Sequence, residues 1–194
     1  MKKSFGLIVL LLCACSLCGC FATFDGARVQ NRSRAVIAGT MYRSEEGNAN
    51  HAALLVGVRS GTIKESNPIA NIEVGMQAVM VPGDMITDED LSIQTSIDVK
   101  WQYLINAPLD GSIRIRSYLP YMIFYPEICL ALGKNYKGYD IYVEGALSTL
   151  TVDENTSPTT LKAGTRIPVG DKTAVIVEAG RSWNVFMVGL GLEF

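Results

Sequence analysis

Apolar and polar residues alternate along most of this chain. The clearest run extends from Leu91 to Ile105, where one parity holds aliphatic and aromatic residues and the other holds mainly serine, glutamine, aspartate and lysine. Side chains of a β-strand alternate between two faces, whereas an amphipathic helix needs apolar residues every three or four positions. The pattern therefore predicts a strand with one apolar and one polar face.

Shorter alternating runs recur along the rest of the chain, separated by turn residues. They predict further strands over 35–43, 53–61, 70–81, 112–119, 121–132, 139–150, 160–169, 173–180 and 185–194. Long polar loops (SEEGNANH, PGDMITDED and TVDENTSP) would lie at one end and short turns (APLDG, GKNYKG and VGDK) at the other. We expect an all-β fold, a closed antiparallel up-and-down β-barrel of about ten strands, or about eight if two weak strands merge or lie outside it.

The chain ends on the segment WNVFMVGLGLEF, whose apolar parity includes Phe186, Leu190 and the terminal Phe194. A strand of roughly ten residues that is apolar on one side suits a membrane barrel. The segment resembles the C-terminal strand of bacterial outer-membrane β-barrels. That resemblance implies that Gly189, Leu192 and Phe194 form the C-terminal signal of such a barrel.

The start of the chain has the pattern of an export signal. Lys2 and Lys3 precede an apolar run, 5–16, which is too short for a spanning helix and ends at Leu17-Cys18-Gly19-Cys20. This tetrad resembles the lipobox of bacterial lipoproteins, although Cys18 is an unusual occupant of its position. A plain secretory signal that is cleaved nearby is the alternative.

The lipobox resemblance implies a division of the chain into three parts. Residues 1–19 would be a lipoprotein signal peptide, 20–33 a lipidated N-terminus and tether, and 34–194 the β-barrel domain. Cys20 would carry lipid on its thiol and its amine, and more than one acyl chain makes a stable anchor. By the same resemblance, Phe21 in place of an aspartate implies sorting to the outer membrane.

Composition narrows the remaining functions. The 194 residues carry a net charge of −2 with no basic stripe, so we expect no nucleic-acid binding. By the lipobox resemblance, three of the five cysteines would leave with the signal and Cys20 would be acylated, which would leave Cys129 without a disulfide partner. We expect Cys129 to fill apolar space, the alternative being a reactive thiol.

The polar parity of the predicted strands collects charges of both signs. We expect these residues to form a charge network in the barrel lumen, because buried charges persist only when they are paired. The network comprises Glu73, Asp98, Lys100, Arg114, Arg116, Glu127, Asp140, Glu144, Lys162, Arg166, Glu178 and Glu193, with Arg59 as a further basic candidate. A lumen plugged by salt bridges is the favoured interpretation, and a narrow polar conduit or a catalytic cleft is the alternative.

Catalytic chemistry finds little support. His51 is the only histidine and is expected in a polar loop, and one histidine with one free cysteine cannot form a usual zinc site. We therefore expect no metal, no cofactor and no catalytic residue. A lipid-modifying barrel enzyme stays open, and it predicts that His51 meets a serine or a carboxylate at the outer rim.

The expected function is that of an outer-membrane lipoprotein, acting as a structural or interaction component of the cell envelope. The arrangement resembles a loose group of bacterial outer-membrane lipoproteins of unknown function. Expected partners are membrane lipid, through the Cys20 acyl chains and the barrel exterior, and the machineries that insert barrels and process lipoproteins. The alternative to a membrane barrel is a lipocalin-like periplasmic lipoprotein that binds an apolar ligand, with the apolar parity facing inward.

Overall fold

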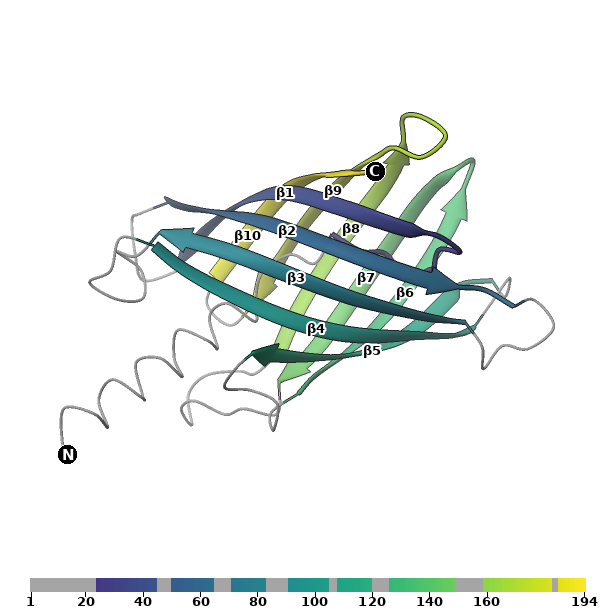
Figure 1. Cartoon of the computed structure of the whole chain (residues 1–194), viewed down its shortest axis with the longest axis horizontal. Helices are drawn as coiled ribbons and strands as arrows, with labels where there is room; N and C mark the ends of the chain where they lie inside the picture. Colours follow the sequence, from purple (N-terminus) through teal and green to yellow (C-terminus); the bar gives the residue numbers. More distant parts are fainter. Residues whose placement is uncertain are drawn as a thin grey trace.

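Ten antiparallel strands close into one barrel (Figure 1). The computed structural model describes residues 24–44, 50–64, 71–82, 91–104, 108–119, 126–148, 159–182 and 185–194. The strands are β1 (Ser33–Ser44), β2 (Asn50–Thr62), β3 (Ile72–Pro82), β4 (Leu91–Leu104), β5 (Asp110–Leu119), β6 (Glu127–Tyr136), β7 (Tyr139–Ser148), β8 (Thr159–Pro168), β9 (Ala174–Ser182) and β10 (Val185–Glu193). Each strand pairs with the next, and β1 pairs with β10 to complete the closure. The predicted ten-stranded fold is confirmed.

The alternation of side chains sets the two faces of the wall. On β10, Phe186, Val188 and Leu190 are exposed on the outside, whereas Met187 and Gly189 are buried on the inside. The apolar parity faces outward on the other strands as well, so the inward-facing arrangement that a lipocalin-like barrel needs is wrong for this chain. Among the described residues, no helix is long and apolar enough to cross a membrane.

Antiparallel pairing places alternate connections at opposite ends of the barrel. The mouth where β1 begins and β10 ends, here called the near mouth, also holds the β6–β7 and β8–β9 turns. The opposite end, the far mouth, is where β1 gives way to β2 and β3 to β4. The predicted far-side loops lie mostly at 45–49, 83–90 and 149–158, outside the described residues.

The sixth strand differs from its prediction. A strand over 121–132 followed by a turn from Gly133 to Gly138 was expected to close this hairpin, but β6 continues to Tyr136. The turn consists of Lys137 and Gly138 alone, with φ of 53° and 91°. Two consecutive residues with positive φ make the tight hairpin turn that matches the twist of a sheet. Residues 121–125 lie outside the described residues.

The segment that precedes β1 also differs from expectation. Residues 24–32 were expected to belong to a tether between lipid and barrel, but the chain from Phe24 to Val29 is packed inside the lumen. Phe24 is fully buried among inward-facing side chains, including Val36, Leu55 and Met187. We call residues 24–32 the lumen segment. Full burial of a phenylalanine side chain stabilises the folded state by about 1.5–3 kcal/mol relative to a tether in which the side chain is exposed to water.

Two glycines of β10 make room for Phe24. A Cβ atom built at Gly191 would lie 2.9 Å from Cδ1 of Phe24, and one built at Gly189 would overlap the far edge of the same ring. The C-terminal strand is therefore shaped to the lumen segment as well as to its neighbours in the sheet.

Gly189→Ala should lower the free energy of unfolding by about 1–3 kcal/mol, because the new methyl group overpacks the lumen against Phe24. The same change in a Phe24→Ala background should cost much less, since the residue that it crowds is gone. Urea unfolding in detergent micelles measures both values. Gly39→Ala is the matched control, because a Cβ atom there meets nothing within 4 Å. Equal costs in both backgrounds would contradict the contact.

Candidate functional site

The barrel lumen is the candidate site, and its centre is the carboxylate of Asp25. The side chain is 2 % exposed and lies among cations from four different strands. Arg34 of β1 donates to Oδ1 at 2.6 Å, Lys100 of β4 donates to both oxygens at 3.0 and 2.9 Å, and Arg114 of β5 donates to Oδ2 at 2.5 Å. Arg59 of β2 adds an ion pair at 3.4 Å. One carboxylate thus ties four neighbouring or facing strands to the lumen segment.

Backbone groups of the lumen segment find their partners on wall side chains. Lys100 donates to the carbonyl oxygens of Gly26 and Arg28 at 3.2 and 3.0 Å, and the Val29 N–H donates to Oε1 of Gln102 at 2.9 Å. The N–H of Asp25 donates to Glu178 on β9 at 3.2 Å. The segment belongs to no strand, so side chains of the wall satisfy these groups where sheet pairing does not.

The same four cations also have partners within the wall. Arg34 pairs with Glu73 at 2.8 Å, and Lys100 pairs with the same carboxylate at 3.0 Å. Arg59 pairs with Asp98 at 2.8 Å. Each cation of the centre is therefore shared between the lumen segment and the barrel itself.

A second group of charges lies on β5, β7, β8 and β9. Glu144 forms ion pairs with Arg114 at 3.1 Å and with Lys162 at 3.0 Å, and Lys162 also lies 3.7 Å from Glu178. The hydroxyl of Tyr142 donates to Glu178. Because Arg114 contacts both Glu144 and Asp25, this group is continuous with the centre of the lumen.

Two further groups lie toward the mouths. Toward the far mouth, Arg116 and the Tyr118 hydroxyl each donate to Glu127 at 2.9 Å. Tyr118 is 5 % exposed, so its side chain belongs to the lumen. At the near mouth, Glu193 accepts from Arg32 of the lumen segment and from Arg166, the latter at 2.7 Å. The last strand therefore contacts both ends of the lumen segment, Phe24 through Gly189 and Gly191 and Arg32 through Glu193.

The residues predicted for the charge network all project into the lumen. Ten of the twelve are buried, and Asp140 and Arg166 are half-buried near the near mouth. All twelve take part in ion pairs with one another or with the lumen segment. Of the residues in the proposed C-terminal signal, Gly189 faces inward, whereas Leu192 and Phe194 are exposed on the outside. Cys20 lies outside the described residues.

Sequence reasoning missed the residue at the centre. Asp25 precedes the first strand, where no alternation assigns it to a face, and its four cationic partners lie between 9 and 89 positions away along the chain. Arg34, Arg28, Arg32 and Asp110 were missed for similar reasons, since each lies at a strand end or in the lumen segment. Arg34 was within reach of the sequence, because it shares the parity of the buried Val36 and Ala38.

Charges within the described lumen balance. Nine cationic side chains and nine carboxylates take part in its ion pairs. Burial alone would raise the pKa of Asp25, which precedes the strands, but Lys100, Arg59, Arg114 and Arg34 together hold that pKa well below its usual range. The carboxylate is therefore ionised at neutral pH and acts as a fixed counter-ion to the four cations.

The outside of the wall has the opposite character. Every one of the ten strands exposes at least one large apolar side chain. Among the described strand residues, the exposed charged side chains are Arg43, Lys134 and Arg181, and each lies near an end of its strand. The apolar side chains therefore form a belt around the barrel, with charge at its edges.

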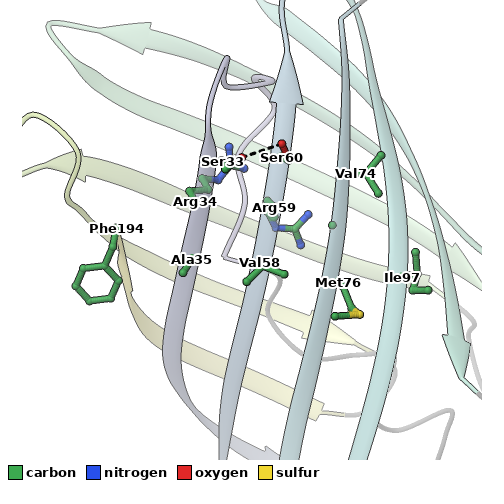
Figure 2. Close-up of a pocket in the computed structure, with 11 residues that line it drawn as sticks. Ser33, Arg34, Ala35, Val58, Arg59, Ser60, Val74, Met76, Ile97 and Phe194 are labelled. Carbon is green, nitrogen blue, oxygen red and sulfur yellow. Dashed lines mark hydrogen bonds between the residues drawn. The ribbon is translucent and has the colours of Figure 1, made fainter.

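A shallow apolar depression interrupts this belt near the start of β1. Figure 2 shows Val58, Met76 and Ile97 projecting from neighbouring strands beside it, with Phe194 on the other side. Gly75 also lines the depression, and the hydroxyls of Ser33 and Ser60 lie 3.0 Å apart at its edge (Figure 2). The lining is largely apolar, with Ser33, Ser60, Arg34 and Arg59 as its polar residues, and it suits contact with another apolar group.

The two residues weighed for other chemistry lie in the wall. His51 is not in a loop as expected, but lies in β2 opposite Tyr42, half-buried near the far mouth. Cys129 is buried in the lumen as a free thiol. Within the described ranges, no group of three or more histidine, cysteine, aspartate or glutamate side chains could hold a metal ion.

Comparisons with known proteins add little to this description. No family model matches the chain, and no curated protein matches it. Among solved structures, the crystal structure of Neisserial surface protein A aligns over 83 % of this chain and 94 % of that chain, at 10 % identity and a TM-score of 0.35. We base no conclusion on a similarity of this size.

Asp25→Asn should lower the free energy of unfolding at pH 7 by about 3–5 kcal/mol, because it leaves four buried cations without their shared counter-ion. Urea unfolding in detergent micelles measures the loss. The exposed Asp171→Asn is the matched control and should change stability by no more than about 0.5 kcal/mol.

The difference between wild type and Asp25→Asn should shrink in acid. The folded state lowers the pKa of Asp25, so its contribution is complete above the unfolded pKa of about 3.9 and is lost as the pH falls through the lower folded value. A difference that stays constant from pH 7 to strongly acidic conditions would show that ionised Asp25 is not what stabilises the lumen.

Proposed function

We propose that this protein is an outer-membrane β-barrel lipoprotein that serves as a structural or interaction component of the cell envelope, with a lumen closed by charged side chains. The observation that carries the proposal is the combination of an apolar belt around all ten strands and a charged interior. In water, an apolar surface that encircles a whole barrel would drive association. In a membrane, the same surface contacts the hydrocarbon of the lipid. Closure of the barrel gives the backbone N–H and C=O groups of every strand hydrogen-bond partners on neighbouring strands.

The positions of the exposed charges support a membrane location over a soluble one. Arg43, Lys134 and Arg181 lie near strand ends, where side chains of a spanning barrel reach the headgroup region. Tyr136 and Tyr139, next to the β6–β7 turn, are both exposed at the near mouth. Aromatic residues at this depth are typical of the interfacial girdles of membrane barrels.

A lipid anchor at Cys20 is the second part of the proposal, supported by the resemblance of Leu17-Cys18-Gly19-Cys20 to a lipobox. The acyl chains would join the barrel exterior in contacting membrane lipid, and processing and barrel-insertion machineries would act on the chain during export. The charges of the described lumen are largely paired with one another, which supports a structural role.

Leu130→Arg tests the membrane location. Leu130 lies within β6 and is exposed on the outside, so an arginine there should cost about 2–4 kcal/mol if the residue faces hydrocarbon. Tyr136→Arg, on the same strand but at the near mouth, should cost about 0–1 kcal/mol. Both variants are unfolded with urea from lipid vesicles. Two near-neutral substitutions, as expected at an ordinary protein surface, would contradict a membrane barrel.

Cys20→Ser tests the lipid anchor separately. Cells fed an alkyne-bearing palmitate analogue should label the wild-type protein and leave Cys20→Ser unlabelled and retaining its signal peptide, since the acceptor thiol is gone. Cys129→Ala is the control and should label like wild type, because that thiol is buried in the lumen. Equal labelling of Cys20→Ser and wild type would contradict lipidation at this position.

A further inference from the structure

The lumen segment is joined to the wall in a way that allows it to leave. Residues 24–32 form no part of any strand, and the barrel closes through pairing of β1 with β10. Backbone hydrogen bonds to the wall backbone occur only at the near-mouth end of the described segment, where Arg32 accepts from Gly61. Withdrawal of residues 24–30 would therefore break side-chain contacts and leave every strand ladder intact.

The wall keeps its own ion pairs when the segment is absent. Arg34 retains Glu73, Arg59 retains Asp98, and Arg114 retains Glu144. Removing Asp25 from the lumen therefore costs these cations one shared partner and leaves each of them another carboxylate. Water entering the vacated space would solvate the remaining polar atoms.

The space that the segment occupies runs along the barrel. Phe24 lies against β1 and β10 deep in the lumen, whereas Val29 contacts Gln102 and Arg32 contacts Glu193 near the near mouth. Wall glycines border this path: Cβ atoms built at Gly133 and Gly191 would lie 2.9 Å from Ala27 and Phe24. The withdrawn segment would thus leave an opening at least as wide as one polypeptide chain.

The lumen-facing side chains of β4 and β5 include buried polar atoms that hydrogen-bond to no group in the described residues. Nε2 of Gln94, Oγ of Ser96 and Nη2 of Arg116 have no hydrogen-bond partner in the described part of the chain. Buried polar atoms in folded proteins bind ordered water where no protein group reaches them. This part of the lumen is therefore suited to water, and the path vacated by the segment would connect it to the near mouth.

The hydrogen-bond donors around the position of Asp25 suit an anion. Four cations converge there, and within their immediate contacts only Glu73 and Asp98 pair with more than one of them. Without Asp25 the four cations keep four wall carboxylates, because Glu144 and Glu193 pair with Arg114 and Arg34, but the nitrogens that donate to Asp25 lose an acceptor. A chloride ion or a small carboxylate could take the place of the Asp25 carboxylate among the same donors.

We infer that the lumen segment is a displaceable plug, and that the barrel conducts small anions when the plug leaves, with Arg34, Arg59, Lys100 and Arg114 forming the site through which they pass. The inference rests on the proposed membrane location. It adds a transport function to a lumen that is otherwise closed. Asp25 is then both the counter-ion of the closed state and a mimic of the anion that passes.

Planar lipid bilayers containing the purified full-chain protein test the inference. Wild type should be closed for most of the recording, and Phe24→Ala/Asp25→Asn should increase the open time about tenfold or more, because both changes weaken the plug and neither alters the wall. A potassium chloride gradient should then give a reversal potential of the sign expected for chloride permeation. Adding Lys100→Gln should reduce that preference, since it removes one cation of the site. Asp171→Asn, exposed in the β8–β9 turn, should behave like wild type.

A second measurement covers the case in which the plug variants do not fold. Ala27→Cys in a Cys129→Ala background places the reactive thiol on the plug, where it packs with Ala131 and Tyr142. A charged methanethiosulfonate reagent should modify it when the plug leaves, and the modified plug should be unable to return, so that conductance persists.

Each outcome decides the inference. The inference is overturned if folded plug variants remain silent, if the reversal potential has the sign expected for cations, or if wild type conducts as well as the plug variants. It is also overturned if the Ala27→Cys thiol stays unmodified and no conductance appears. A barrel that inserts into lipid and shows the Leu130→Arg penalty but never conducts would overturn the plug alone. A barrel without that penalty would overturn the membrane location as well.

Discussion

The carboxylate of Asp25 is the interaction on which the interior of this barrel depends. Four cations from β1, β2, β4 and β5 converge on it, and each also pairs with a carboxylate of the wall. Charges buried at this density are tolerated only when every one has a counter-ion and hydrogen bonds. The lumen segment supplies the shared counter-ion, and the glycines of β10 supply the space for the Phe24 ring beside it.

The outer and inner faces of the barrel wall differ in the side chains that they carry. Alternation along each strand sends apolar side chains outward and charged or small side chains inward, so a single period-two pattern produces both the belt and the lumen. Charged side chains of the inner face pair with side chains of other strands and of the lumen segment. Glycines occupy the inner face where the lumen segment approaches the wall closely. On the outer face, the exposed charges lie near the strand ends.

Much of the wall could be predicted from the sequence, because alternation is a local signal. The strand expected from Leu91 to Ile105 is found from Leu91 to Leu104, and the charged parity that was assigned to a lumen does project inward. β6 was misplaced because Gly-Lys-Asn-Tyr has the composition of a turn, while cross-strand pairing with β7 extends the ladder to Tyr136. The lumen segment could not be predicted, because Phe24 and Asp25 belong to no periodic run and depend on partners from distant strands.

The central claim is that residues 24–32 lie inside the barrel, and disulfide trapping tests it most directly. Ala27 packs with Ala131 on the inner face of β6, so Ala27→Cys/Ala131→Cys in a Cys129→Ala background should cross-link in lipid vesicles. The cross-link should change the gel mobility and be reversed by reductant. Ala27→Cys/Ile128→Cys, with the second residue exposed on the outer face of the same strand, should not cross-link. Failure of the first pair, with Ala27→Cys reacting as fast as a thiol in open solvent, would place the segment outside the lumen and contradict this account.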